Sequence, residues 1–230
     1  MKSKSYFSFG TSLHKALQRF HDSQDQGVST IEEAKAALEE SWIDAGYANA
    51  EEMSEALAEG KEILSSYVEQ VLTAPVTAKT LYLEKTLRTT LDGFVLLGRL
   101  DRVDEWDDGS LEILDYKTGR SGVTSDEAAQ DLALNVYQLL LKKHHPERSV
   151  CASIIAVRSG EKGTFSLTDQ ELSDLESDLN SLGKEILNRD YENLRPKPKS
   201  LCPQCDFLAL CKRDPDFAEA YGFDSAPSAL

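Results

Sequence analysis

The chain has 230 residues, of which 40% are hydrophobic, and its formal net charge is -15. A chain of this length can bury one sizeable core, so one domain is the default expectation. The acidic balance argues against nucleic-acid binding over a broad surface, because affinity for phosphates comes largely from lysine and arginine. The charge is regional, however: residues 29–62 hold ten acidic and two basic side chains, and residues 195–213 hold five basic and one acidic.

Two further features of the composition concern the cellular compartment. No apolar run approaches the length that spans a bilayer, and the amino end lacks the continuous apolar segment of a secretory signal. We therefore expect a cytoplasmic protein without a membrane partner. Three of the four cysteines cluster near the carboxyl end, and in that compartment such a cluster points to metal binding more than to disulfides.

Apolar periodicity divides the chain into helices, then strands, then a helix and further strands. Helices are expected at 11–22, 30–42, 50–72, 126–143 and 168–189, and strands at 80–90, 93–104, 110–116, 149–157 and 163–167. This order favours an α/β core with a central sheet covered by helices. We divide one domain into a helical amino-terminal part at 1–78, the core at 79–194 and a basic cysteine-containing segment at 195–230.

An acidic hairpin is the most unusual stretch of the sequence. Residues 98–120 read GRLDRVDEWDDGSLEILDYKTGR and hold seven acidic side chains. Alternation along the second strand places Asp115 and Lys117 on the face of Leu111 and Ile113. A loop centred on Asp108 would place position 101 opposite position 115, with Cβ atoms roughly 5 Å apart.

This register would bring two carboxylates together, and their repulsion is relieved when a cation lies between them. Mg²⁺ or Mn²⁺ suits such a site, because these ions take a few carboxylates and leave positions for phosphate oxygens. Lys117 could orient an attacking water and offset charge in a phosphoryl transition state. The alternative is a solvated edge where Asp101 pairs with Arg99 or Arg102, and Asp115 pairs with Lys117.

The segments GRLDRVD at 98–104 and DYKTG at 115–119 resemble the motifs of the PD-(D/E)XK nuclease superfamily, specifically its RecB-like branch. That branch includes the nuclease domains of RecB and AddB and the exonucleases of CRISPR adaptation. The resemblance implies a restriction-endonuclease-like core with a mixed sheet. It also implies Asp101 and Asp115 as metal-binding acids, the Tyr116 backbone carbonyl as a further ligand, and Lys117 as the motif lysine.

Other segments extend the resemblance. SFGTSLHKALQRFHD at 8–22 resembles the branch's amino-terminal helix, which implies a metal-binding role for His14; a structural histidine is the alternative. Glu84 in LYLEKTL matches an acidic residue that precedes the hairpin and helps to position DNA; an exposed strand residue is the alternative.

The helix after the hairpin departs from the branch pattern. Tyr137 in LALNVYQLLL matches the tyrosine of Gln-x-x-x-Tyr, but Ala133 stands where the glutamine belongs. Gln130 lies two helical turns before Tyr137 and would share its face in a continuous helix, so it could replace the glutamine in positioning DNA. The alternative for Tyr137 is a core residue.

The cysteines at the carboxyl end resemble three ligands of the branch's iron-sulfur cluster. The spacing of Cys202, Cys205 and Cys211 matches. A 4Fe-4S cluster is bound by four thiolates, however, and residues 1–13 contain no cysteine that could be the fourth. Either the fourth ligand is lost, or the chain starts late relative to its relatives, or Cys151 or another group contributes. A zinc or vestigial site is the alternative, and a buried free thiol is the expected state of Cys151.

These features together predict a metal-dependent exonuclease that acts on single-stranded DNA ends in repair or recombination. A basic channel would guide the strand; its expected residues are Arg120, Lys142, Lys143, Arg195 and Lys197. The alternative is a catalytically impaired nuclease-fold subunit that binds DNA or a helicase partner. A third reading is a metal-storage or electron-transfer protein.

Overall fold

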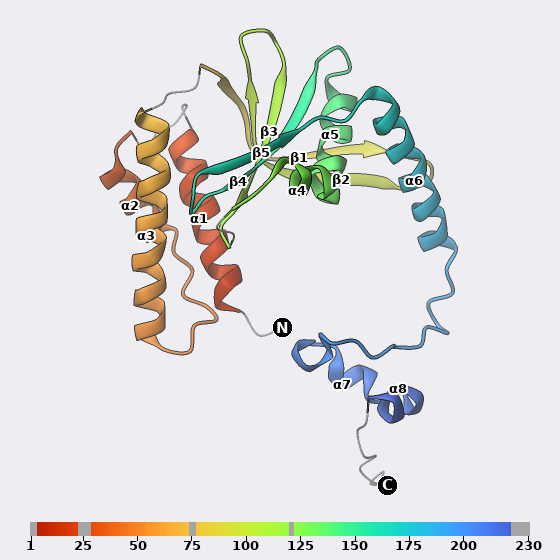
Figure 1. Cartoon of the computed structure of the whole chain (residues 1–230). Coiled ribbons are helices and arrows are strands. Elements are labelled where there is room, and N and C mark those ends of the chain that lie inside the picture. Colours follow the sequence, from red (N-terminus) through yellow and green to blue (C-terminus); the bar gives the residue numbers. More distant parts are fainter. Residues whose placement is uncertain (1–3, 23–28, 74–76, 120–121, 222–230) are drawn as a thin grey trace. The chain divides into compact units, whose positions relative to one another are not determined.

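The computed structural model describes residues 4–22, 29–73, 77–119 and 122–221 (Figure 1). The described residues fall into two compact units that divide between residues 184 and 185, within helix α6. The helices of the first unit are α1 (Ser5–His21), α2 (Ile31–Glu40), α3 (Ala50–Thr73), α4 (Ser125–Gln130), α5 (Leu132–His144) and most of α6 (Asp169–Asn188). Its strands are β1 (Lys79–Thr90), β2 (Val95–Glu105), β3 (Leu111–Lys117), β4 (Val150–Ala156) and β5 (Glu161–Phe165).

The five strands form one mixed sheet in the order β1-β2-β3-β4-β5. Strands β3 and β4 run parallel, and the other neighbours run antiparallel. Helices α4 and α5 make the crossover that a parallel pair requires. The expected α/β architecture with a mixed central sheet and flanking helices is therefore confirmed.

The alternation of β3 divides the core between the two faces of the sheet. Leu114 and Tyr116 pack into a cluster with α1, α2 and α3. Leu111 and Ile113 pack into a second cluster with α4 and α5. This is the alternation predicted from the sequence, and it assigns Asp115 and Lys117 to the α5 face by their spacing.

The hairpin between β2 and β3 has the predicted register. Val103 pairs with Ile113 and Asp104 with Glu112, so the same register carried two residues further places Asp101 opposite Asp115. The loop closes through hydrogen bonds from the Trp106 N–H to the Ser110 carbonyl and from the Gly109 N–H to the Trp106 carbonyl. Gly109 has a φ of 83°, which glycine adopts without steric cost.

The expected continuous helix over 126–143 is wrong. Asp131 has an extended backbone, with φ of -76° and ψ of 107°, and its side chain accepts the N–H groups of Ala133 and Leu134. It thus ends α4 and caps α5. Gln130 and Tyr137 therefore lie on different helices, and the shared-face argument for Gln130 does not hold.

The last strand begins two residues earlier than the expected 163–167. The β4–β5 turn is tight, because the N–H groups of Ser159 and Gly160 both donate to the Ala156 carbonyl. Gly160 has a φ of 75°, and strand pairing resumes at Glu161 opposite Ala156.

The second unit is made of short elements. It contains the end of α6, a 3-10 turn η1 (Cys202–Gln204), α7 (Leu208–Cys211) and α8 (Pro215–Ala220). Asp214 caps α8 through the Phe217 N–H and pairs with Arg195, and the Phe217 side chain is buried. No helix in the described part of the chain is long and apolar enough to cross a membrane.

Candidate metal centre

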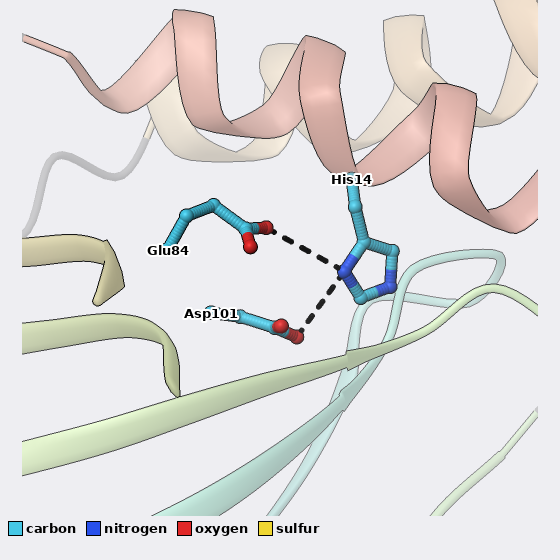
Figure 2. Close-up of side chains that lie close together, drawn as sticks. All are labelled: His14, Glu84 and Asp101. Carbon is cyan, nitrogen blue, oxygen red and sulfur yellow. Dashed lines mark ion pairs between the residues drawn. The ribbon is translucent and has the colours of Figure 1, made fainter. Parts of the chain in front are cut away.

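Three side chains from three different elements converge beside the sheet. His14 comes from α1, Glu84 from β1 and Asp101 from β2, and one ligand atom of each lies within 4.8 Å of the others (Figure 2). His14 Nδ1 lies 3.3 Å from Asp101 Oδ2 and 3.9 Å from Glu84 Oε1. One imidazole nitrogen and two carboxylates are donors that divalent metal ions accept in proteins.

Glu84 reaches this cluster through an unusual backbone conformation. It has a φ of 47°, in the left-handed region that residues other than glycine rarely adopt. The β1–β2 ladder pairs Leu83 with Arg102 and Lys85 with Leu100, and this unchanged register sets Glu84 opposite Asp101. Such strained residues gather at functional sites, where the surrounding fold holds them in place.

Asp101 and His14 are tied to the peptide groups around Tyr116. Asp101 Oδ2 accepts the Tyr116 N–H at 3.0 Å, and His14 Nε2 lies 3.1 Å from the Tyr116 carbonyl oxygen. The carbonyl that the resemblance implies as a ligand therefore lies beside the His14 ring. Three of the predicted ligands, His14, Asp101 and the Tyr116 carbonyl, occupy one small region.

The electrostatics of His14 favour a cation at this point. Burial lowers the pKa of His14, but its hydrogen bond to Asp101 and the negative charges of Asp101, Glu84 and Asp115 outweigh burial, so its pKa is raised. The same negative charges would attract a divalent ion, which would displace the proton from the His14 ring when it binds. The donor set and the field therefore fit Mg²⁺ or Mn²⁺.

Asp115 and Lys117 lie close together, as their spacing predicts. Lys117 Nζ is 2.7 Å from Asp115 Oδ2. That oxygen is buried, and no group in the described residues meets it in hydrogen-bonding geometry. Burial and the charge of Asp101 raise the pKa of Asp115, against the opposing effect of Lys117. A buried, incompletely satisfied carboxylate near a second one is a further sign of a cation site, although Asp115 lies outside the 4.8 Å group.

The solvated-edge alternative accounts for only one of these pairs. Arg99 pairs with Glu84, and Arg102 pairs with Asp104. Asp101 thus interacts with His14 and the Tyr116 N–H in place of the two arginines beside it in the sequence. Only the pairing of Asp115 with Lys117 agrees with that alternative.

A buried network supports Tyr116 from the other face of the sheet. Arg102 is largely buried, forms a bidentate pair with Asp104 and donates a 3.2 Å hydrogen bond to the Tyr116 hydroxyl. Arg102 Nη1 also lies 2.7 Å from His21 Nε2. Sequence reasoning missed this network, although the alternation of Arg102 and Asp104 along β2 could have indicated a shared face. Because Tyr116 is buried, its ring is a packing residue here.

The predicted DNA-positioning residues lie in different surroundings. Tyr137 is partly buried against the core, and burial together with the negative charges of Asp115 and Asp101 raises its pKa. Gln130 is exposed at the end of α4. Lys142 pairs with Asp169, and Lys143 pairs with Glu176. Arg120 lies outside the described residues.

The three carboxyl-terminal cysteines share one short segment of the second unit. The Cys205 N–H donates to the Cys202 carbonyl, and Cys202 Sγ accepts the Lys199 N–H at 3.2 Å. Among the described residues, only His14, Glu84 and Asp101 offer three ligand atoms within 4.8 Å of one another. Cys151 lies in β4 of the first unit, where burial raises the pKa of its thiol to about 11.

The family model for the PD-(D/E)XK nuclease superfamily matches residues 2–212, which is most of the chain and includes every residue of the site. This chain belongs to the PD-(D/E)XK nuclease superfamily. Members of the superfamily hydrolyse phosphodiester bonds in DNA with divalent metal ions. Membership therefore implies phosphodiester hydrolysis as the reaction, DNA as the substrate and a divalent metal ion as the cofactor. The cluster of His14, Glu84 and Asp101 could bind such an ion.

Two solved structures resemble the nuclease at low identity. The protein SSO0001 is 16% identical, with a TM-score of 0.35, and the match covers 91% of this chain and 85% of that one. A protein from Eubacterium rectale described as "Putative exonuclease" is 12% identical, with a TM-score of 0.38, and the match covers 100% and 96%. The comparison with curated proteins finds no match. Likeness at this level supports no inference about function.

Proposed function

We propose that this nuclease is a metal-dependent exonuclease that degrades single-stranded DNA from its ends, in repair or recombination. The observation that carries the proposal is the convergence of His14, Glu84 and Asp101. Asp115 and Lys117 lie on the neighbouring strand β3, and the register places Asp115 opposite Asp101. These positions support the assignment of the motif residues that the resemblance implies.

Mg²⁺ or Mn²⁺ would be held by His14, Glu84 and Asp101, together with Asp115 and the Tyr116 carbonyl. The ion supplies positive charge against the phosphate oxygens and activates a water for attack. Lys117 contributes its own positive charge. Burial lowers the pKa of Lys117, but the negative charges of Asp115, Asp131 and Asp101 outweigh burial, so the pKa is raised and the ammonium form is favoured. Its fixed charge stabilises the additional negative charge of the transition state.

The finer assignment follows the motif resemblance. The segments around Asp101 and Asp115 support membership of the RecB-like and AddB-like branch, and that branch motivates a helicase partner and single-stranded substrates. The cytoplasmic location expected from the sequence remains a prediction. In α4 and α5, Tyr137 stays a candidate for positioning DNA, whereas Gln130 has lost its geometric support.

We further propose that the segment with Cys202, Cys205 and Cys211 binds a metal. Absorbance and metal content of anaerobically purified protein separate the two candidates. Iron with inorganic sulfide and a visible absorption band indicates a 4Fe-4S cluster with one ligand from elsewhere, and stoichiometric zinc indicates a zinc site. Protein without either metal argues against a metal at these cysteines.

Internally labelled DNA tests the proposed activity. The wild-type protein is incubated with Mn²⁺ and a linear single strand, a circular single strand or a linear duplex, beside the Asp115→Ala variant. We expect release of short products from the linear single strand by the wild type only, with the circle intact. Cleavage of the circle would show an endonuclease. Intact DNA in every reaction would favour a nuclease-fold subunit that binds DNA or a helicase without turnover.

A further inference from the structure

Asp131 stands at the junction between α4 and α5, and both of its carboxylate oxygens have partners. Oδ1 accepts the N–H groups of Ala133 at 2.9 Å and Leu134 at 3.2 Å, which begins α5. Its own N–H donates to the Ala128 carbonyl at the end of α4. The two cap hydrogen bonds fix the side-chain rotamer, so Oδ2 has a defined direction.

Oδ2 of Asp131 points toward the motif lysine. It lies 3.7 Å from Lys117 Nζ, and that ammonium lies 2.7 Å from Asp115 Oδ2 on its other side. Lys117 is thus held between a carboxylate from its own strand and one from the start of α5. Both Lys117 and Asp131 are mostly shielded from solvent, with side-chain exposures of 29% and 21%.

Asp115 alone is a poor anchor for Lys117 during the reaction. If Asp115 shares its carboxylate with a divalent ion, as the proposed function requires, less of its charge remains for the lysine. A lysine side chain has four flexible carbons and loses much rotamer entropy when it is fixed, so a second contact helps to keep its ammonium in one place. Asp131 lies on another element and keeps its charge available.

We propose that Asp131 is a positioning residue that holds the Lys117 ammonium at the reacting phosphate. The inference rests on the proposed function. In the branch pattern a glutamine stands two residues later, at the position of Ala133, so here the same helix start contributes a carboxylate directed at the lysine. Asp131 acts through Lys117 and needs no contact with DNA or metal.

Two substitutions separate the role of Asp131 as the cap of α5 from the role of its negative charge. Asparagine caps helices about as well as aspartate, so Asp131→Asn removes the charge and leaves α5 capped, whereas Asp131→Ala removes both. We expect kcat on single-stranded DNA to fall about 10- to 100-fold in both variants, with KM within about twofold of wild type. The melting temperature should fall further in Asp131→Ala, which loses the cap and the charge, than in Asp131→Asn, which loses the charge alone. Wild-type kcat in Asp131→Asn would overturn the proposal.

A double-mutant cycle tests the contact without activity. Urea unfolding is measured for the wild type, Asp131→Asn, Lys117→Met and the double variant. We expect the two substitutions to be non-additive, because the contact is lost in either single variant. Strict additivity would overturn the contact. If the wild type cleaves no DNA, the proposed function fails, and the cycle still decides whether Asp131 holds Lys117.

Discussion

At the scale of single residues, the site is defined by which charged side chains form ion pairs with one another. Asp101 has arginines on both sides in the sequence, yet Arg99 pairs with Glu84 and Arg102 with Asp104. Asp101 therefore faces His14, and its charge belongs to the cluster. Spacing along the chain could identify the candidate acids, but it could not decide between these partners.

Arg99 provides a test of the cluster at this scale. Its Nε and Nη2 both contact Glu84 Oε2, while Glu84 Oε1 faces His14. Arg99→Gln should weaken Mn²⁺ binding about 10- to 100-fold, because groups that orient a ligand contribute to metal affinity. Calorimetric titration of Mn²⁺ measures this change. The exposed Arg88, changed to glutamine, is the matched control, and equal affinities in the two variants would contradict the orienting role.

Cys151 gives a residue-scale prediction that depends on pH. Burial raises the pKa of its thiol to about 11, so the reactive thiolate is scarce at neutral pH. Iodoacetamide should modify Cys151 slowly at pH 8, with a rate that rises roughly tenfold per pH unit until the pH nears that pKa. Peptide mass spectrometry follows the modification in protein treated with a chelator. Modification of Cys151 at pH 8 as fast as the exposed Cys205 would show that the thiol is accessible and ionised.

At the scale of elements, helix α5 packs against strand β2 at Gly98, where only glycine leaves enough space for the side chains of α5. A Cβ atom on Gly98 in β2 would lie 2.8 Å from ring atoms of Tyr137 and 2.8 Å from a methyl of Leu140. The motif glycine before Asp101 is thus explained by helix packing.

Gly98→Ala should therefore destabilise the protein. Overpacking costs about 1–3 kcal/mol, whereas the lower entropy of the unfolded alanine chain returns only about 0.4–1 kcal/mol, so we expect a net loss on the order of 1 kcal/mol. Urea unfolding measures it. Gly119→Ala is the control, because a Cβ there meets nothing within 4 Å, and its effect should stay within about 0.5 kcal/mol. A stabilised Gly98→Ala variant would contradict the packing.

The sequence predicts elements well where local pattern decides them. The register of Asp101 and Asp115 follows from alternation and from a loop centred on Asp108, and both are local. The break between α4 and α5 is made by the side-chain cap of Asp131. The run around it lacks glycine and proline, so apolar periodicity alone predicts one continuous helix. The left-handed conformation of Glu84 is held by tertiary contacts, which local pattern cannot reveal.

At the scale of the whole molecule, the net charge of -15 limits how many phosphates the protein can hold. Acidic side chains crowd α2, α3 and the segment between them, at residues 29–62, and Lys142 and Lys143 are already paired with acids. Binding of DNA should therefore use few ionic contacts and depend on the metal centre.

Salt dependence measures the number of ionic contacts. With about two to four phosphates contacted, the logarithm of the affinity for a single strand should fall with the logarithm of salt concentration with a slope of about -1.4 to -2.8. Fluorescence anisotropy with the inactive Lys117→Met variant, which keeps the proposed metal ligands, gives this slope. A slope steeper than about -5 would show an extensive basic track and would contradict the limit set by charge.

Crystals of the protein soaked with Mn²⁺ test the central claim most directly, because anomalous scattering locates the ion without any assay of activity. We predict one or two anomalous peaks at the β2–β3 hairpin, within about 2.2 Å of oxygens of Asp101 and Asp115 and in contact with His14. At saturating Mn²⁺, the absence of a peak there, or an ion held by other residues, would contradict the account.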